Sequence, residues 1–200
     1  MNSHTNYLTF KWNSFKLNCM TNLFENFNLL LKQINSKTEQ KVARILLNNS
    51  MTISTAESCT GGLISSRLTD IAGSSAFVKE NYVTYANESK TKLLGVSEQT
   101  LEKFGAVSEK CALEMVQGLF ETTNCDVALA TTGIAGPDTS ENKNVGLIYI
   151  AIKNKYATSV KKIELSPYYK RKTMKFLFSQ KALELLIEFL KKNVEQKQAR

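Results

Sequence analysis

The stretch MTISTAESCTGGLISSRL, residues 51–68, joins a predicted strand, a polar glycine loop and a predicted helix. Its first five residues are rich in β-branched side chains and bounded by polar ones, which is typical of a short strand. After Gly61 and Gly62, apolar residues return at helical spacing and predict an amphipathic helix. A strand that passes through a short loop into a helix is the building unit of α/β folds.

The same alternation continues on both sides of this stretch. The last two predicted strands follow each other through a short polar link, so part of the sheet is expected to be antiparallel. We therefore predict an α/β sandwich with a mixed sheet. The further predicted elements are a helix over 39–48, a turn over 72–77, a strand over 81–87, helices over 97–105 and from Ser108, strands over 126–133, 145–153 and 158–165, and a last helix over 169–193.

Composition limits the chemistry. The chain has 200 residues, and its one histidine is His4 near the N-terminus. Catalytic triads with a histidine base and histidine-rich metal sites are excluded unless a partner supplies them. The four cysteines show no C-x-x-C spacing, so neither a zinc site nor a disulfide framework is expected. With no apolar run of about 20 residues and no convincing signal peptide, we expect a cytoplasmic protein that does not enter a membrane.

Positive charge is concentrated in the last quarter of the chain. The net charge is +8, and residues 151–200 hold 13 of the 26 Lys and Arg residues but 4 of the 18 Asp and Glu residues. Such a bias is compatible with binding to nucleic acid or to an anionic ligand. A solvated, lysine-rich helix face is the commoner cause of such a bias.

Two polar glycine junctions follow predicted strands, at 57–62 and at 131–136. Ligands of open α/β sheets bind at the carboxyl ends of strands, so these two loops could line one crevice. Neither contains a dinucleotide or P-loop fingerprint. The first one opens a helix, where free backbone amides favour an anion such as phosphate. A helix start capped by Ser58 or Thr60 is the alternative interpretation.

A nucleophile in the first loop would need a base. Cys59 could be a thiolate at the helix start, although a buried inert cysteine is the commoner case. Ser58 has no base nearby in sequence, but Tyr85 and Lys90 are candidates to supply one. A lysine base must be neutral, which requires burial or a neighbouring cation. A solvated Lys90 and a half-buried Tyr85 remain the alternative.

Four motifs then occur in the order and spacing of one known family. They are the stretch from Thr55 to Val96, GAVSE at 105–109, TGIAGPD at 132–138 and VGLIYIAI at 145–152. Across about residues 38–192 the chain resembles the CinA C-terminal domain family, whose characterised members are nicotinamide-nucleotide amidases (nicotinamide mononucleotide deamidases).

The resemblance implies a three-layer α/β/α sandwich and an amidohydrolase without metal or other cofactor. The implied reaction converts nicotinamide mononucleotide to nicotinate mononucleotide and ammonia, a salvage step towards NAD. A serine, a tyrosine and a lysine carry it. Transferred to this sequence, the resemblance places these roles on Ser75 in AGSSAF, Tyr85 in VTYAN and Lys90 in NESK.

The resemblance also implies a substrate-binding set drawn from the glycine junctions, the loop before the Lys90 helix and the start of the last helix. A pair of family arginines before that helix corresponds to Arg171 and to Lys175, which departs from the pattern. The expected set is Glu57, Ser58, Thr60, Gly61, Gly62, Gly73, Ser74, Asn87, Thr132, Gly133, Gly136, Arg171 and Lys175.

The expected organisation is an N-terminal extension at 1–37, an amidase domain at 38–193 and a polar tail at 194–200. The extension is too short for the molybdopterin-binding type of domain that many family members carry, so a stand-alone deamidase, pairing as a homodimer, is implied. The competing hypothesis is a competence- or damage-linked protein that binds nucleotides or nucleic acid without amidase activity. We regard nucleic acid as the less favoured partner, because interleaved stacking aromatics are missing.

Overall fold

A five-stranded mixed sheet forms the centre of the molecule, in a computed structural model that describes residues 38–198 and their side chains through Asn193. The strand order is β2-β1-β3-β4-β5. β1 lies parallel to both β2 and β3, whereas β4 runs antiparallel to β3 and to β5. The strands span Ile53–Glu57 (β1), Val78–Val83 (β2), Val127–Gly133 (β3), Leu147–Lys153 (β4) and Thr158–Glu164 (β5).

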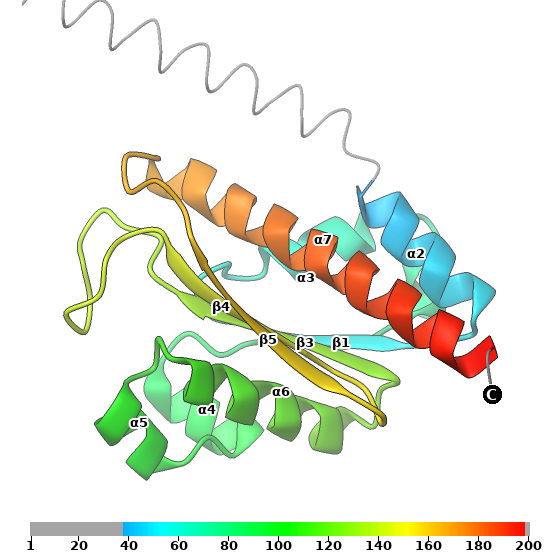
Figure 1. Ribbon diagram of the computed structural model, residues 1–200, viewed down its shortest axis with the longest axis horizontal. Helices are drawn as coiled ribbons and strands as arrows, with labels where there is room; N and C mark the ends of the chain where they lie inside the picture. The colour runs from blue at the N-terminus through cyan, green and yellow to red at the C-terminus, as the bar shows by residue number, and fades with distance from the viewer. Residues whose placement is uncertain (1–37, 199–200) are drawn as a thin grey trace, which may run out of the picture. The chain divides into compact units, whose positions relative to one another are not determined.

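Helices cover both faces of the sheet (Figure 1). One layer contains α2, Thr38–Asn48, α3, Leu63–Thr69, and α7, Arg171–Gln198. The opposite layer contains α4, Asn87–Leu94, α5, Glu98–Phe104, and α6, Glu109–Thr123. The fold is thus a three-layer α/β/α sandwich with a mixed sheet, as the sequence and the resemblance predicted.

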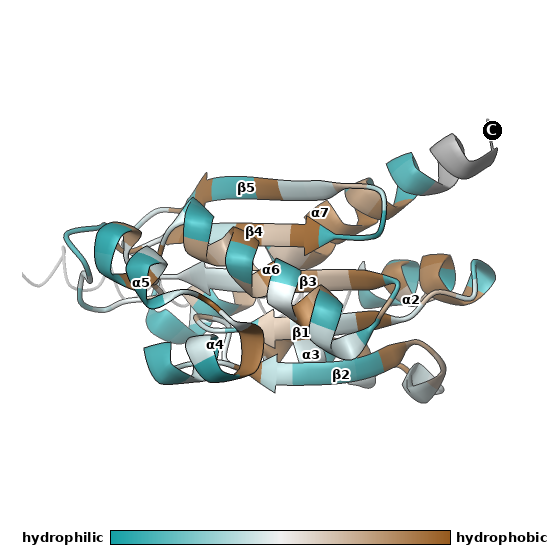
Figure 2. Ribbon diagram, turned by 90° about the horizontal axis from the view of Figure 1, so that it is seen from below, coloured by the Kyte–Doolittle hydropathy of each residue, from teal (hydrophilic) through white to brown (hydrophobic). Residues whose placement is uncertain are grey.

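Burial follows the position of each strand in the sheet. The central strand β3 is buried along almost its whole length, whereas the edge strands β2 and β5 are partly exposed. Figure 2 shows the corresponding hydrophilic stretches on these two strands. Each face of the sheet has its own apolar core, with Phe178 of α7 on one side and Met115 of α6 on the other. None of the helices in residues 38–198 is long and apolar enough to cross a membrane.

The helix ends match the predicted signals. Ser97 caps α5 by accepting a hydrogen bond from the Thr100 amide, and Gly105 ends that helix. Ser108 caps α6 by accepting from the Cys111 amide. These contacts confirm the predicted caps and stop.

Several element boundaries differ from the sequence-based expectation. β2 begins at Val78 and β4 at Leu147, whereas starts at 81 and 145 were predicted. β1 begins at Ile53 rather than at residue 51, because the amide of Thr52 donates to the Asp126 side chain at 2.8 Å. β2 ends at Val83, and the chain from there to α4 forms a loop. α7 continues to Gln198, beyond its predicted end at 193. The predicted extension at 1–37 lies outside the described residues.

A buried arginine joins the helices of one layer. Arg67 of α3 is 5% exposed, forms an ion pair with Glu39 of α2, and donates to Ser179 Oγ of α7 at 2.7 Å. Its guanidinium also lies 4.9 Å from the centre of the Phe176 ring. Because buried charges are tolerated when they are paired, this network fixes how α2, α3 and α7 pack together.

Candidate active site

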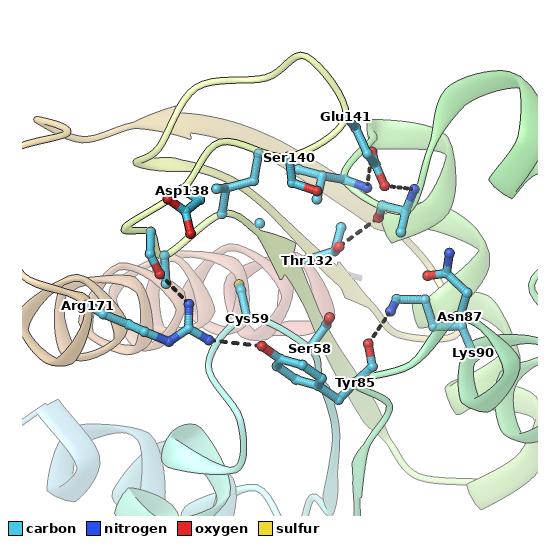
Figure 3. Close-up of a pocket in the computed structure, with 16 residues that line it drawn as sticks. Ser58, Cys59, Tyr85, Asn87, Lys90, Thr132, Asp138, Ser140, Glu141 and Arg171 are labelled. Carbon is cyan, nitrogen blue, oxygen red and sulfur yellow. Dashed lines mark hydrogen bonds between the residues drawn. The ribbon is translucent and has the colours of Figure 1, made fainter.

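A cavity of about 320 Å³ opens where β1 and β3 end and where the chain leaves β2 (Figure 3). The parallel strands β2, β1 and β3 all have their carboxyl ends at this edge of the sheet. This is the position at which open α/β sheets bind ligands. The predicted residues that line the cavity are Ser58, Tyr85, Asn87, Lys90, Thr132, Gly133, Gly136 and Arg171.

Lys90 is a buried lysine on the first turns of α4. Its side chain is 1% exposed, and Nζ donates a hydrogen bond to the backbone carbonyl of Tyr85 at 3.1 Å. Burial lowers the pKa of Lys90, although the nearby Cys111 and Cys59 act in the opposite direction. A lysine with a lowered pKa more readily exists as the neutral amine, which is the form that accepts a proton.

Ser58 lies directly after β1, where the strand turns into the glycine loop. Its amide donates to the carbonyl of Thr131 at 3.0 Å, which continues the pairing of β1 with β3 by one more residue. Its carbonyl accepts instead from the Gly61 amide at 3.1 Å, so the chain leaves the sheet here. Ser58 is therefore held by the sheet on one side while its side chain lines the cavity.

Gly133 lies on β3 beside the end of β1. The next amide, that of Ile134, donates to Leu147 of β4 at 2.8 Å. Because amides alternate in direction along a strand, the Gly133 amide is directed away from β4, toward the space beyond the end of β1. A side chain at this position would place its Cβ 2.5 Å from the Leu147 carbonyl oxygen. Glycine thus permits close packing of β3 against β4 here, and the backbone N–H of this residue is directed to the β1 side of β3.

Tyr85 and Arg171 meet at the mouth of the cavity (Figure 3). Arg171 donates through Nη2 to Tyr85 Oη at 2.9 Å and through Nη1 to the Gly136 carbonyl at 2.5 Å. The guanidinium therefore connects the start of α7 with the loops that follow β2 and β3.

A carboxylate in the β3–β4 loop organises another wall of the cavity. Glu141 accepts from the amides of Ala106 and Val107 at 2.8 and 3.1 Å, and from Lys143 Nζ at 2.9 Å. Burial alone would raise the pKa of Glu141, but these hydrogen bonds outweigh it and lower the pKa. Thr132 Oγ1 holds the same segment by donating to the Ala106 carbonyl at 2.6 Å.

Eight residues that line the cavity were not in the predicted set of site residues, although three of them lie in the two loops that were expected to line one crevice. The additional lining residues are Cys59, Ala106, Val107, Ile134, Ala135, Asp138, Ser140 and Glu141. The available signals were the GAVSE and TGIAGPD motifs, which contain five of them. No local pattern shows that Glu141 reaches back to residues 106 and 107.

Within one chain, the predicted nucleophile Ser75 lies outside the cavity that Tyr85 and Lys90 line. Ser75 lies in the short 3-10 helix Ser74–Ala76, before β2 begins, whereas Tyr85 follows the end of that strand. The six residues of β2 separate the two positions by roughly 20 Å. Ser75 therefore lies at the amino end of β2, whereas the cavity lies at the carboxyl ends of the parallel strands. The same correction applies to Gly73 and Ser74, which were expected to bind substrate.

Glu57 is also placed differently from the expectation. Its side chain is fully buried, and its carboxylate accepts from the amides of Ile64 and Ser65 at 3.0 and 2.7 Å. These are amides of the first turn of α3, the same groups that were expected to bind a phosphate. Glu57 therefore caps the helix, and the predicted anion site at this helix start is wrong.

The neighbouring loop residues do not line the cavity. Thr60 is fully buried, with its hydroxyl 2.9 Å from that of Thr131. Gly61 and Gly62 have positive φ angles of 58° and 87°, which glycine adopts at little cost. Lys175 lies against this loop, with Nζ 3.0 Å from the position of a Cβ on Gly61.

Cys59 lines the cavity as a thiol rather than a thiolate. Burial and the nearby Glu57 raise its pKa to about 12. This argues against a nucleophilic role at neutral pH, because the thiolate is the reactive form. Across the described part of the chain, no group of three or more His, Cys, Asp or Glu side chains is arranged to hold a metal ion.

Comparisons with known proteins agree with this architecture. A CinA-like protein from Chlorobium limicola is 52% identical over 118 residues, which is 58% of this chain and 28% of that protein. A CinA-like protein from Chloroherpeton thalassium is 46% identical over 162 residues, covering 76% of this chain and 37% of that protein. The chain thus spans about a third of the length of the curated relatives it matches.

Solved structures match over nearly their whole length. The competence/damage inducible protein CihA from Agrobacterium tumefaciens has a TM-score of 0.72 and 40% identity, covering 76% of this chain and 95% of that chain. A competence-damaged protein (CinA) superfamily protein from Escherichia coli has a TM-score of 0.73 and 31% identity, covering 76% and 88%. The profile of the CinA C-terminal domain matches residues 35–190, and the chain therefore belongs to the CinA C-terminal domain family.

Proposed function

We propose that this chain is an amidohydrolase that converts nicotinamide mononucleotide to nicotinate mononucleotide and ammonia, with Ser58 as nucleophile in place of Ser75. The observation that carries the proposal is that Ser58, Tyr85 and Lys90 line the same cavity, and that this lysine is buried. A serine with a neutral lysine in reach needs no histidine, which suits a chain whose one histidine is His4.

The proposed reaction has two halves. Ser58 Oγ attacks the carboxamide carbon, and its proton passes to Lys90 directly or through Tyr85. The carbonyl oxygen becomes an oxyanion, and the Gly133 amide is a suitably directed donor for it. Lys90, through Tyr85, then protonates the departing nitrogen, the C–N bond breaks, and ammonia leaves an acyl ester on Ser58.

Water completes the second half. It attacks the ester carbon while Lys90 accepts one of its protons, and the same proton returns to Ser58 as the C–O bond breaks. The carboxylic acid that forms loses its remaining proton to solvent, nicotinate mononucleotide leaves, and Ser58, Tyr85 and Lys90 regain their starting protonation states. The positive charge of the pyridinium ring near Lys90 further disfavours the ammonium form during the reaction.

The substrate phosphate needs a cationic partner. Because Glu57 already occupies the amides at the start of α3, Arg171 at the cavity mouth is the better candidate. Its planar guanidinium offers several donors to a phosphate. Lys175, above Gly61, adds a second positive charge on the same helix.

The decisive experiment is a pair of serine variants assayed for ammonia release from nicotinamide mononucleotide. Ser58→Ala should abolish release and Ser75→Ala should leave it unchanged, with both proteins showing wild-type circular dichroism. Full activity in Ser58→Ala would refute the mechanism. Absence of ammonia release by the wild-type protein, across a panel of pyridine carboxamides, would refute the function.

A nucleic-acid-binding function is the second candidate. It is favoured by the cations Lys170, Arg171, Lys172 and Lys175 around the start of α7, and by relatives named competence/damage inducible proteins. Salt-dependent DNA or RNA binding that is lost in Lys170→Gln/Lys172→Gln would support it. Nicotinamide mononucleotide should be included as a competitor, because Arg171 and Lys175 belong to both proposals.

A further inference from the structure

Arg171 ties together two loops that flank the cavity. It is the first residue of α7, and that helix is anchored in the core by Met174 and Phe178, which are both fully buried. Its guanidinium donates to the Gly136 carbonyl in one loop and to Tyr85 Oη in the other. Figure 3 shows these two contacts, with the tyrosine ring extending across the opening towards the arginine.

Tyr85 depends on this contact for its orientation. Its ring is 61% exposed, so packing restrains it weakly. Its backbone carbonyl accepts a hydrogen bond from Lys90, and its hydroxyl oxygen accepts one from Arg171. Arginine can only donate hydrogen bonds. The phenol oxygen is therefore the acceptor in this contact, and its own hydrogen is left to donate to a group in the cavity.

We infer that Arg171 is a positioning residue for Tyr85 that keeps the phenol oriented as a proton donor to the reacting group. The inference rests on the proposed amidase function, in which Tyr85 carries a proton between Lys90 and the departing nitrogen. It goes beyond the phosphate contact that the family resemblance implies. An arginine that only binds phosphate changes substrate affinity, whereas one that orients Tyr85 also changes the rate of the chemical step.

The test is a double-mutant cycle on two substrates. The proteins are wild type, Arg171→Met, Tyr85→Phe and the double variant, with Lys172→Met as the control for loss of an exposed neighbouring cation. The substrates are nicotinamide mononucleotide and nicotinamide riboside, which lacks the phosphate. The second readout needs no substrate. It is the NMR chemical shift of Tyr85 in protein labelled with ¹³C at tyrosine Cζ. The Tyr85 signal is identified as the one that disappears in Tyr85→Phe.

We expect Arg171→Met to lower kcat at least about tenfold on both substrates, as part of the roughly 100-fold contribution of a general acid. In the Tyr85→Phe background the same change should have little further effect on kcat. The Tyr85 signal should shift in Arg171→Met and stay unchanged in Lys172→Met.

Two results would overturn the inference. One is an Arg171→Met protein that raises KM for the mononucleotide alone and leaves kcat on the riboside unchanged. The other is a Tyr85 signal that does not respond to Arg171→Met, which would show that the contact does not form in solution. If the wild-type protein releases no ammonia, the proposed function fails, while the NMR measurement still decides whether Arg171 orients Tyr85.

Discussion

Replacing Glu57 with glutamine distinguishes a structural role for this side chain from a substrate-binding one. Glu57 Oε1 accepts from the amide and the hydroxyl of Ser65 at 2.7 and 2.6 Å, and Oε2 accepts from the Ile64 amide at 3.0 Å. Glutamine has the same shape, but one of its terminal atoms is an NH₂ group that cannot accept. If the amide oxygen keeps both bonds to Ser65, the NH₂ group faces the Ile64 N–H, which then has no acceptor.

The loss of stability in Glu57→Gln follows from these hydrogen bonds. A buried amide left without a partner destabilises a protein by about 1–3 kcal/mol. Losing a negative charge at a helix start adds about 0.3–1 kcal/mol. We therefore expect Glu57→Gln to lower the free energy of unfolding by roughly 1–4 kcal/mol. Because Glu57 does not line the cavity, KM for nicotinamide mononucleotide should change little in the folded protein.

Urea denaturation followed by circular dichroism measures this effect as a lower midpoint with an unchanged slope. Glu109→Gln is the matched control, since Glu109 lies in the first turn of α6 but is exposed. That control should lose less than about 1 kcal/mol. A Glu57→Gln protein with the wild-type midpoint and a raised KM would show that Glu57 contacts substrate, and the capping interpretation would be wrong.

Three further predictions follow from single side chains. The rate of ammonia release should rise with pH through an apparent pKa below the ordinary lysine value, since burial lowers the pKa of Lys90; a flat profile would contradict a lysine base. The pKa of Lys90 is lowered in the folded chain and ordinary in the unfolded chain, so at a pH between these two values only the unfolded chain holds the proton. The free energy of unfolding, measured in urea titrations relative to Lys90→Met, should therefore rise with pH in this range. Cys59 has a pKa of about 12, so at neutral pH it should react more slowly with iodoacetamide in the folded protein than in urea, which mass spectrometry can follow. The variant Cys59→Ala should keep most of the rate of ammonia release. Thr84→Val should raise the free energy of unfolding by about 1 kcal/mol in thermal denaturation, because the fully buried Thr84 hydroxyl has no hydrogen-bond partner among the described residues; a loss of stability would reveal a bound water.

Much of the fold could be predicted because its signals are local. Hydrophobic periodicity identified β3 and α6, and single residues such as Ser108 and Gly105 marked helix ends. Two features depend on contacts between distant segments and left no local signal. One is the hydrogen bonding of Glu141 to residues 106 and 107, and the other is the capping of α3 by Glu57. Glu57 resembled a substrate-binding residue in sequence, because a polar side chain beside a glycine loop suits either role.

The choice between Ser75 and Ser58 shows how strand direction decides a site. Ser75 is nearer to Tyr85 in sequence, but β2 lies between them and carries the chain from one edge of the sheet to the other. Ser58 is farther away in sequence, yet β1 is parallel to β2, with Glu57 paired to Val83, so the residues after both strands emerge at the same edge. The rule that ligands bind at the carboxyl ends of strands had already grouped the loops at 57–62 and 131–136. Applied to β2 as well, it selects Tyr85 and Lys90, which follow the strand, and rejects Ser75, which precedes it. Within one chain, the serine that follows the neighbouring parallel strand β1 and lines the same cavity as these two residues is Ser58.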